Sequence, residues 1–474
     1  MSVDVKLIDK KTYEEKMDNL TMAILGISAS QGGEVAIKNW LQVQQIVRMG
    51  LAPKFFSIGD ILYVEKESAI SITCSNLSVS VSINADTFIG VVGETGNIDY
   101  EFTYDGVEWH KEDNTPINLA TYGISLSGSN PQEGDKIVIH ETADSIPMVV
   151  VGFDQETPVD TTREHSMSLL MLNTFTGVVF SATQALFQFP DGLAAGSYAF
   201  SIDASYDSAY GGGSTLYFTL TQAIPAGGQI YFPWGYQQQA SATKITTYAS
   251  ASATSALESN VSVSTTEIAG ATNLGTIANS TIQSVTVGGV SVKINNVARA
   301  RYGNNNWKES AIRQWCNSSA KKGSVWTPQN IFDRAPSWAS TLDGFMHGLD
   351  SHLVSAIGKV KKTTLLNNVT DGGGNVQTEE TCWLMSMGEM GVSGFSAEGS
   401  QYDYYKKLLG GLISDWSTHS ELIKTNKAGN PQYWWLRSPI TGNSYYARYV
   451  DTSGLVSRYG AYGGYQAVVG FAII

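Results

Sequence analysis

The sequence predicts a multidomain, mainly β protein whose C-terminal domain is α+β. Three properties of the 474-residue chain indicate this class. Only 15% of its residues are charged, against about 25% in typical globular proteins. It contains 47 Gly, and many short stretches alternate apolar and polar residues, as half-buried strands do. At roughly 100–200 residues per domain, this length predicts about three domains.

Charge and hydropathy exclude several classes of partner. The net charge is −13, from 30 basic and 43 acidic residues. Nucleic-acid binding is disfavoured, because phosphate contacts need clustered Lys and Arg. No apolar run reaches the ~18 residues of a membrane span, so we expect no membrane insertion. Residues 1–16 lack the apolar core of a signal peptide, which favours synthesis in a cytoplasm.

Metal and disulfide sites are not expected. Cys74, Cys316 and Cys382 lie far apart and form no CxxC pair, so we interpret them as reduced core residues. His347 and His352 are five residues apart, which is not the spacing of a helical metal pair. The sequence therefore predicts no metal ion and no cofactor.

The first third of the chain is expected to anchor the protein. Residues 1–33 are interpreted as a charged N-terminal arm. Residues 34–152 are interpreted as a β-rich anchoring domain led by a helix over 34–49, which ends at Gly50 because glycine favours helix termination. Asp105 and Gly106 lie between alternating stretches, which predicts a β-hairpin.

The middle of the chain is expected to be all β. Residues 153–240 contain short strands at roughly regular spacing, which is typical of a β-sandwich. The stretch 203–207 with the following glycines resembles a calcium loop, but it lacks the spacing and the closing Glu of an EF-hand. Residues 241–296 are rich in Ser, Thr and Ala. They are interpreted as an extended connector laid along a partner subunit, with a flexible linker as the alternative.

The C-terminal domain is expected over residues 297–474. Its periodicity predicts helices over 310–318, 342–360 and 402–413, and a strand over 381–386. Thr327 and Pro328 also have the pattern of an N-cap followed by the first helical residue.

The segment 443–465 has an unusual composition. Six of its 23 residues are Tyr, whereas the whole chain of 474 has 23. Most of the others are Gly, Ser and Ala, and the segment contains no Lys, Glu, Gln, Met or Trp. Tyr with Ser and Gly is the composition of antibody-like binding surfaces; the alternative is an ordinary pair of strands joined by glycine-rich turns. We refer to residues 443–465 as the tyrosine tract.

Ten residues of the tyrosine tract are the candidate ligand-binding residues, because aromatic and Arg side chains dominate binding hot spots. Tyr449 and Tyr465 are also candidates for packing inward. The ten are Asn443, Ser444, Tyr445, Tyr446, Arg448, Tyr449, Arg458, Tyr459, Tyr462 and Tyr465.

Three motifs follow one another in the last part of the chain. Residues 306–317 read NWKESAIRQWCN, residues 380–386 read ETCWLMS and residues 433–439 read YWWLRSP. In order and spacing they resemble a bacterial and phage family of C-type-lectin-like domains, related in fold to the formylglycine-generating enzyme. The resemblance covers 297–474. It departs at the final strand, where Val468 and Val469 are followed by Gly470 and the Arg-Pro of the family is absent.

The motifs also supply a set of expected structural residues. Trp434, Leu436 and Pro439 are expected in the core as alternating strand residues. Arg437 is expected as a buried ion-pair partner, with a ligand contact as the alternative. The structural set is Trp307, Trp315, Trp383, Trp434, Trp435 and Arg437.

The resemblance implies a function. Domains of this family occur in phage virion proteins and in targets of diversity-generating retroelements, which mutate adenines in a repeat rich in asparagine codons at the 3′ end of a gene. The composition of the tyrosine tract fits the residues that such codons can give. The implied protein is a phage virion subunit, made in the bacterial cytoplasm and assembled with other virion proteins. Its variable lectin-like domain binds a host-surface glycan or protein.

Other functions remain as alternatives. A capsid- or tail-decorating subunit whose lectin-like domain serves assembly only would have the same sequence features. A secreted adhesin is disfavoured by the missing signal peptide. Enzymatic activity is not expected, because no catalytic set is recognisable and no Cys follows Cys382. We expect a homo-oligomer, and by analogy with fibre-like phage proteins a trimer.

Overall fold

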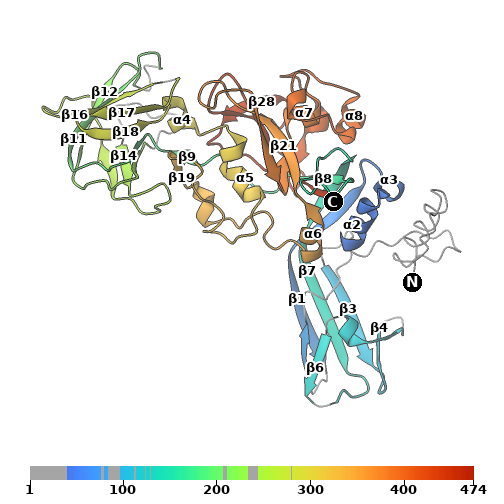
Figure 1. Ribbon diagram of the computed structural model, residues 1–474. Coiled ribbons are helices and arrows are strands. Elements are labelled where there is room, and N and C mark those ends of the chain that lie inside the picture. Colours follow the sequence, from blue (N-terminus) through green and yellow to red (C-terminus); the bar gives the residue numbers. More distant parts are fainter. Residues whose placement is uncertain are drawn as a thin grey trace, which may run out of the picture. The chain divides into compact units, whose positions relative to one another are not determined.

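The protein is mainly β and contains several sheets connected by short helices, as the sequence predicts (Figure 1). The computed structural model describes residues 40–75, 79–83, 97–111, 114–122, 124–128, 130–206, 211–232, 244–278 and 280–474. The expected arm over 1–33 and the start of the expected helix over 34–49 lie outside these residues. The chain divides into two compact units. The first comprises Met1–Leu169, Gly348–Gly358 and Ala472–Ile474, and the second Leu170–His347 and Lys359–Phe471.

The first unit is built on long antiparallel strands. β1 (Ile61–Ser75) pairs with β7 (Lys136–Phe153), which also pairs with β3 (Asn97–Tyr104) (Figure 1). The predicted hairpin is confirmed: β3 pairs with β4 (Trp109–Lys111), and Gly106 between them has a φ of 96°. The other strands are β2 (Val79–Ile83), β5 (Pro116–Ile117), β6 (Ile124–Gly128), β8 (Met167–Met171), β20 (Ile357–Gly358) and the end of β29 (Val469–Ile473).

In its described residues the first unit also contains the short α-helices α2 (Trp40–Arg48), α3 (Ala52–Phe55) and α6 (Ser351–Ala356) and a 3-10 helix over Leu119–Tyr122. α2 buries one face, and Gln44 Nε2 donates hydrogen bonds to the carbonyls of Ser355 and Ala356 at 3.2 and 3.3 Å. The prediction of a helix over 342–360 is wrong except for α6. Gly348 has a φ of 72°, which interrupts helical geometry. The helix α6 begins after Asp350, whose carboxylate caps it by accepting the backbone N–H of Leu353.

The second unit contains a β-sandwich with an aromatic core. Its larger sheet has the order β15-β14-β13-β10-β18-β17, and its smaller sheet the order β12-β11-β16. Phe200 packs against Phe187, Phe218 and Phe232 at ring-centroid distances of 5.3, 6.1 and 6.2 Å. The strands are β10 (Phe187–Phe189), β11 (Gly196–Ile202), β12 (Thr215–Leu220), β13 (Gly228–Tyr231), β14 (Lys244–Tyr248), β15 (Glu258–Ser262), β16 (Thr272–Ile277), β17 (Gln283–Val287) and β18 (Val290–Ile294).

Residues 241–296 differ from the expected connector. They contribute strands β14 to β18 to both sheets of the sandwich. Their β-branched and apolar residues alternate with Ser and Thr, so Leu274 and Ile277 are fully buried while the hydroxyl-bearing residues between strands face outward. Val297 and Ala300 of the next helix enter the same core. The low charge of this segment therefore reflects a folded part of the sandwich rather than a linker.

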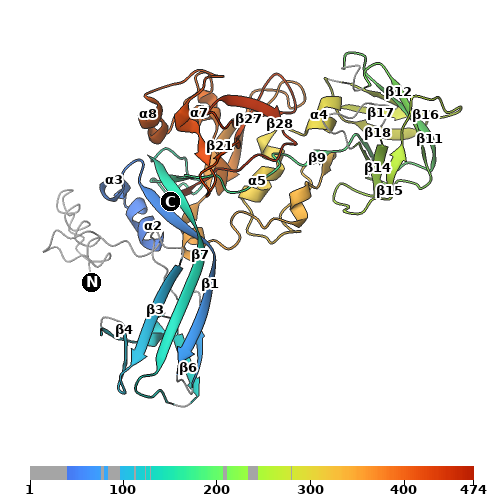
Figure 2. The same cartoon turned by 180° about the vertical axis from the view of Figure 1, so that it is seen from behind.

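The rest of the second unit combines short helices with small sheets (Figure 2). The expected helices over 310–318 and 402–413 are present but shorter, as α5 and α8, and the helix expected from Thr327 is absent. The Gln314 side-chain oxygen instead accepts the backbone N–H of Thr327 at 2.8 Å. The elements are α4 (Val297–Tyr302), α5 (Ala311–Cys316), β9 (Thr183–Gln184), β19 (Asp333–Arg334), β21 (Val360–Leu365), β22 (Asn375–Glu380), β23 (Cys382–Leu384), α7 (Met387–Met390), α8 (Asp403–Leu409), β24 (Lys424–Thr425), β25 (Pro431–Gln432), β26 (Trp434–Pro439), β27 (Tyr446–Val450) and β28 (Val456–Gly460).

A buried carboxylate connects the first two sequence motifs. Glu380 is fully buried at the end of β22. It accepts hydrogen bonds from Trp307 Nε1 at 3.1 Å, Arg313 Nε at 2.6 Å and Asn317 Nδ2 at 2.9 Å. Because one carboxylate is shared by three side chains of the motif over 306–317, the spacing of these residues is a packing requirement.

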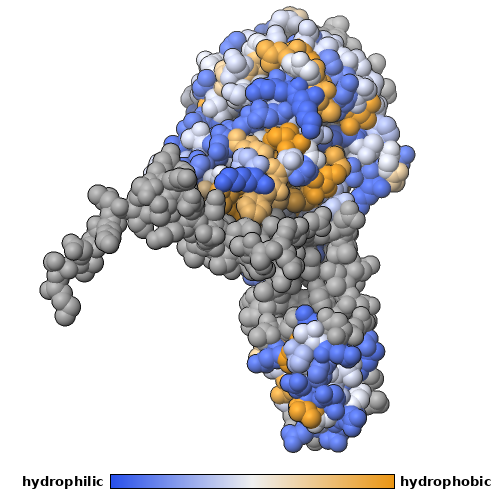
Figure 3. Space-filling view, turned by 90° about the vertical axis from the view of Figure 1, so that its right-hand side faces the viewer, coloured by the Kyte–Doolittle hydropathy of each residue, from blue (hydrophilic) through white to orange (hydrophobic). Residues whose placement is uncertain are grey.

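The surface combines small apolar patches with polar areas. On the face in Figure 3, hydrophobic side chains gather in patches between hydrophilic ones. In the second unit, Leu412, Trp416 and Tyr433 are 70, 47 and 42% exposed. None of the helices in the described part of the chain has the length and apolarity to cross a membrane.

The role of residues 241–296 predicts the outcome of two matched substitutions. Ile277 is 0% exposed and Ile282 is 39% exposed. We expect Ile277→Ala to lower the free energy of unfolding by ~2–5 kcal/mol, because it leaves a cavity in the sandwich core. Ile282→Ala should cost well under half as much. Urea denaturation followed by tryptophan fluorescence measures both, and equal small effects would contradict the assignment of this segment to the core.

Lys424 is a buried cation in β24. Its Nζ donates a hydrogen bond of 2.9 Å to the carbonyl of Met171. Burial lowers the pKa of Lys424 from 10.5 to about 7, because desolvation penalises the charged form.

This lowered pKa predicts a stability that depends on pH. Between about pH 7 and 10.5 the unfolded chain binds a proton at Lys424 that the folded chain has released, so stability rises with pH across this window. Lys424→Met should remove the rise and should stabilise the protein most at pH 7 and below, by roughly 2–5 kcal/mol. Thermal unfolding at pH 6, 7.5 and 9 measures the effect. Parallel curves for the two proteins would contradict it.

Candidate functional site

The tyrosine tract forms a β-hairpin with two different faces. β27 pairs with β28, and β26 pairs with β27 on its other side. Side chains alternate between the faces of a strand, so Tyr449 and Tyr459 lie on one face of the hairpin, and Arg448 and Arg458 lie opposite each other on the other face. The pair of strands is the alternative that the composition of the tract left open, and the division of its side chains between two faces was not predicted.

Five tyrosines gather on the first face, which we call the aromatic face. Trp435 is fully buried beneath it and lies 4.8 Å from Tyr465 between ring centroids. Tyr465 is also 4.8 Å from Tyr449 and 5.1 Å from Tyr459. The five are Tyr433, Tyr449, Tyr459, Tyr462 and Tyr465. All except Tyr433, which is more exposed, are half-buried, so each ring packs on its neighbours and still presents an edge to solvent.

The second face, which we call the arginine face, is held by an ion pair. The buried Arg448 contacts Asp415 through Nη1–Oδ1 at 2.8 Å and Nη2–Oδ2 at 2.5 Å. Burial lowers the pKa of Arg448, although Asp415 acts in the opposite direction. Trp416 lies over Arg448 at 4.4 Å, and the exposed Arg458 lies between the rings of Trp416 and Tyr446.

The start of the tract is fixed by one side chain from outside it. Asn305 Nδ2 donates to the carbonyls of Ile440, Asn443 and Tyr446 at 3.3, 2.9 and 3.0 Å. Asn305 is fully buried. The Asn443 side-chain oxygen also accepts the backbone N–H of Tyr446 at 2.9 Å. The turn that leads into β27 is therefore held from outside by Asn305 and from within by Asn443.

Other backbone contacts continue this arrangement. The N–H of Val178 donates to the carbonyl of Tyr465 at 2.9 Å, and the N–H of Tyr462 donates to the carbonyl of Tyr302 at 2.9 Å. The ring of Tyr302 stacks on that of Tyr445 at 5.0 Å, and burial raises the pKa of Tyr445.

Two glycines of the tract are required by the rings beside them. A Cβ at Gly460 would lie 2.6 Å from the ring of Tyr462, and a Cβ at Gly463 would lie 2.8 Å from the ring of Tyr459. Both distances are shorter than a real Cβ contact allows. Tyr459 and Tyr462 can therefore pack closely only because these two positions lack side chains.

The structure brings most of the candidate ligand-binding residues together on the two faces of one hairpin. The six tyrosines and Asn443 are half-buried, and Arg458 is exposed. Ser444 and Arg448 are 1 and 4% exposed, and the Arg448 charge is already paired. These two side chains lie beneath the surface and support it, so their positions differ from those expected of ligand contacts.

Four residues outside the candidate set also contact the tyrosine tract. Tyr433 belongs to the aromatic face, Asp415 and Trp416 belong to the arginine face, and Tyr302 stacks on Tyr445. Tyr433 directly precedes the buried pair Trp434–Trp435, so its sequence gave a usable signal. Trp416 lies in a loop between elements, where neither periodicity nor composition indicates contact with β27 and β28. Asp415 could be identified only through its ion pair with Arg448.

The six expected structural residues are all buried, at 0 or 1% exposure. Two of the tryptophan N–H groups reach backbone acceptors: Trp434 Nε1 donates to the carbonyl of Leu422 and Trp435 Nε1 to that of Val178, at 3.1 and 3.0 Å. The buried N–H of Trp383 has no hydrogen-bond partner among the described residues. Arg437 forms an ion pair with Glu389, which Lys362 also contacts at 2.9 Å. The structure thus places Arg437 as an internal ion-pair partner and not at the surface.

The Arg437 guanidinium connects several elements. It donates to the carbonyls of Leu384 and Glu398 at 2.7 and 3.0 Å in addition to the Glu389 carboxylate. Burial alone would raise the pKa of Glu389, but Arg437 and Lys362 outweigh it and lower the pKa to about 2. Burial raises the pKa of the neighbouring Glu398.

No arrangement in the described residues indicates a metal centre: they contain no cluster of three or more His, Cys, Asp or Glu side chains able to hold an ion. Cys316 and Cys382 are buried free thiols, and burial raises the pKa of both. A thiol is nucleophilic as its thiolate, so neither has the character of a reactive cysteine. The side chain of Cys74 lies outside the described residues.

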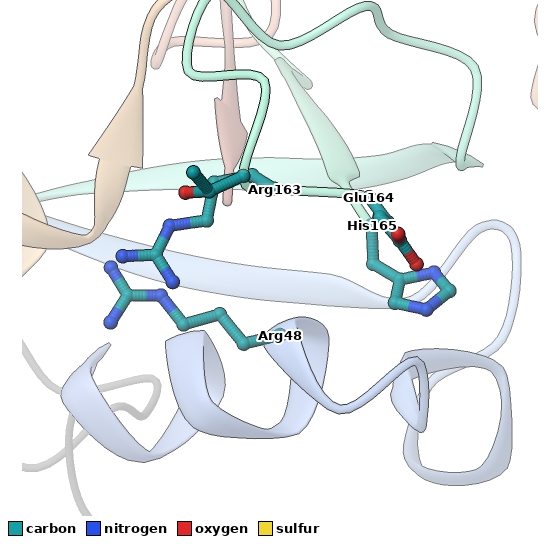
Figure 4. Close-up of a pocket in the computed structure, with 5 residues that line it drawn as sticks. Arg48, Arg163, Glu164 and His165 are labelled. Carbon is teal, nitrogen blue, oxygen red and sulfur yellow. The ribbon is translucent and has the colours of Figure 1, made fainter.

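The first unit contains a small polar pocket of about 150 Å³ (Figure 4). The guanidinium groups of Arg48 and Arg163 lie close together in it. Arg48 donates to the carbonyl of Ile474 at 3.2 Å, and Asp160 lies 3.5 Å from Arg163. Because nearby acceptors already offset both cations, the pocket is a weaker candidate than the hairpin surface.

Comparisons with known proteins gave one family. Residues 276–470 match a family described as a domain of unknown function (DUF6273). The matched range begins in β16 and includes β17 and β18 of the sandwich, together with the helices and sheets that carry the hairpin. No curated protein and no solved structure matches the chain.

The buried ion pair predicts a large effect of one substitution. Arg437→Met leaves the Glu389 carboxylate without its bidentate partner in a site closed to water. We expect a loss of ~3–5 kcal/mol in the free energy of unfolding. Arg458→Met is the matched control, because that arginine is exposed, and it should cost less than about 0.5 kcal/mol. Denaturant unfolding monitored by tryptophan fluorescence measures the free energy of unfolding of both variants. Similar losses for the two would contradict a large contribution of the ion pair to stability.

Proposed function

We propose that this chain is a phage virion protein whose C-terminal region displays a C-type-lectin-like domain that binds a ligand on the host surface. The observation that supports this most is the construction of the tyrosine tract. Four of its six half-buried tyrosine rings lie on the aromatic face, while buried groups outside the tract hold much of its backbone.

The physical basis is the separation of surface from scaffold. Tyrosine offers a large, rigid and amphipathic contact area at low entropic cost. Loops on a stable framework can change side chains without disturbing the core. Asn305 binds the tract through carbonyl groups, which every residue has, so its own contacts do not require particular side chains there. Within the turn, Asn443 is the side chain that also holds the backbone.

The C-type-lectin-like fold is part of the same proposal. The motif over 306–317 meets Glu380 at the end of β22, and the following strand β23 pairs with β29 at the C-terminal end of the chain. The β26 strand with its buried tryptophans then carries the hairpin. These relations support the resemblance that the motifs indicate.

The first unit would anchor the protein to the particle. Its long paired strands, β1 and β7, offer an extended framework for association, and a trimer is the assembly that we propose. Several copies on one particle would turn weak single contacts into firm attachment. A stable monomeric mass in solution would rule out the trimer.

The test is binding of the full chain to host cells, in monomeric and multimerised form. The variant carries Tyr445, Tyr446, Tyr459 and Tyr462 changed to Ser. We expect at least about a tenfold loss of affinity, because truncated aromatic hot spots cost ~1–2 kcal/mol or more each. The control changes Tyr217 and Tyr404, half-buried tyrosines outside the tract, to Ser.

Circular dichroism and unfolding curves establish that all three proteins are folded. A selective loss in the tract variant supports a receptor-binding face. If the unchanged protein binds no host cells in either form, the lectin-like domain serves assembly, and the chain is a capsid- or tail-decorating subunit.

A further inference from the structure

The arginine face holds two cations that differ in their partners. Arg448 is buried and paired with Asp415. Arg458 is exposed, and within the described part of the chain it makes no ion pair or hydrogen bond. Asp415 has both carboxylate oxygens on Arg448, so the charge of Arg458 is available to a ligand.

Two aromatic rings position Arg458. Its guanidinium carbon lies 5.4 Å from the ring centroid of Trp416 and 5.0 Å from that of Tyr446. Both distances lie within the ~6 Å of cation–π attraction. Because Arg458 has no hydrogen-bond acceptor in the described part of the chain, its N–H donors remain available, and a guanidinium can donate two parallel hydrogen bonds to a carboxylate.

Trp416 is held in an unusual conformation at the surface. Its φ is 64° and its side chain is 47% exposed. Bulky residues rarely adopt this left-handed region. The Asp415 carboxylate accepts the Trp416 N–H at 2.9 Å, and Arg448 lies 4.4 Å from its ring. Backbone strain that presents an exposed ring, instead of burying it, is typical of a functional position.

We propose that Trp416, Arg458 and Tyr446 form a platform for a carboxylate-bearing sugar of a surface glycan. The carboxylate would accept hydrogen bonds from Arg458, and the C–H face of the sugar ring would pack on the Trp416 indole. This inference rests on the proposed receptor-binding function and names the chemistry of the ligand.

A sugar acid fits this platform better than an acidic peptide does. It carries its carboxylate and its apolar C–H face on one small ring, so a single residue meets both the guanidinium and the adjacent indole. A peptide would need two side chains of different kinds in a fixed relation. Because the protein carries a net charge of −13, a local cation is also needed to offset the repulsion of an acidic ligand.

The test uses the multimerised full chain and soluble polymers that carry N-acetylneuraminic acid or glucuronic acid. Each polymer is compared with its carboxyl-reduced form. We expect at least about tenfold tighter binding to an acidic polymer than to its reduced form, a preference that weakens with added salt.

Variants assign the contact. Arg458→Gln should remove about tenfold or more of the affinity for the acidic polymer and leave the reduced form unaffected. Arg458→Lys should restore part of it, and Trp416→Ala should weaken both forms. Arg163→Gln, which removes a partly exposed arginine of the first unit, is the matched control and should change nothing.

The outcomes separate this inference from the function on which it rests. Equal binding to acidic and reduced polymers, or no binding to any acidic polymer, overturns the inference. So does stronger competition by polyglutamate than by the acidic polymers, which would indicate a peptide ligand. If host-cell binding still depends on the tyrosine tract in these cases, the receptor-binding function stands; if the unchanged protein does not bind host cells, that function falls.

Discussion

The contact between Arg437 and Glu389 is the interaction on which the C-terminal part of the chain most depends. It connects β26 to the start of α7, where Glu389 also closes a capping box with Ser386. Lys362 from β21 completes the charge balance. Ion pairs closed to water repay their desolvation only with good geometry and full hydrogen bonding, and both conditions are met here. The strand β26, which pairs with the hairpin, is therefore held in place by the ion pair of Arg437 and by its two buried tryptophans.

The hairpin surface depends on β26 and its buried contacts, and adds little to these contacts itself. Trp435 is buried under the aromatic face, and Arg448 is paired under the arginine face. The side chain of Asn305 donates hydrogen bonds to backbone carbonyls of the turn that leads into β27. Side chains at the surface thus rest on a layer that is complete without a ligand. Such a layer is what preorganised binding requires, because little conformational entropy remains to be lost on association.

The sequence predicted the mainly β class, most sandwich strands and the buried state of Trp434 and Arg437, because alternation and motif spacing are local signals. It failed where tertiary contacts decide. Residues 241–296 read as a connector because their core positions are spread over five short strands. The helix expected over 342–360 was reduced to six residues by Gly348, whose positive φ is not visible in an apolar pattern. Trp416 was missed because its place at the surface depends on the ion pair between Asp415 and Arg448, two residues that lie far apart in the chain.

The two glycines between the rings limit how the hairpin surface can change. Gly460 and Gly463 provide the space that Tyr462 and Tyr459 occupy. A larger residue at either glycine is compatible only with a smaller or displaced ring at the partner position, and the same holds in reverse. Substitutions in the tract are therefore coupled in pairs. The number of side-chain combinations open to the hairpin surface is smaller than the product of the choices at each position, because a larger residue at Gly460 or Gly463 requires a second change at Tyr462 or Tyr459.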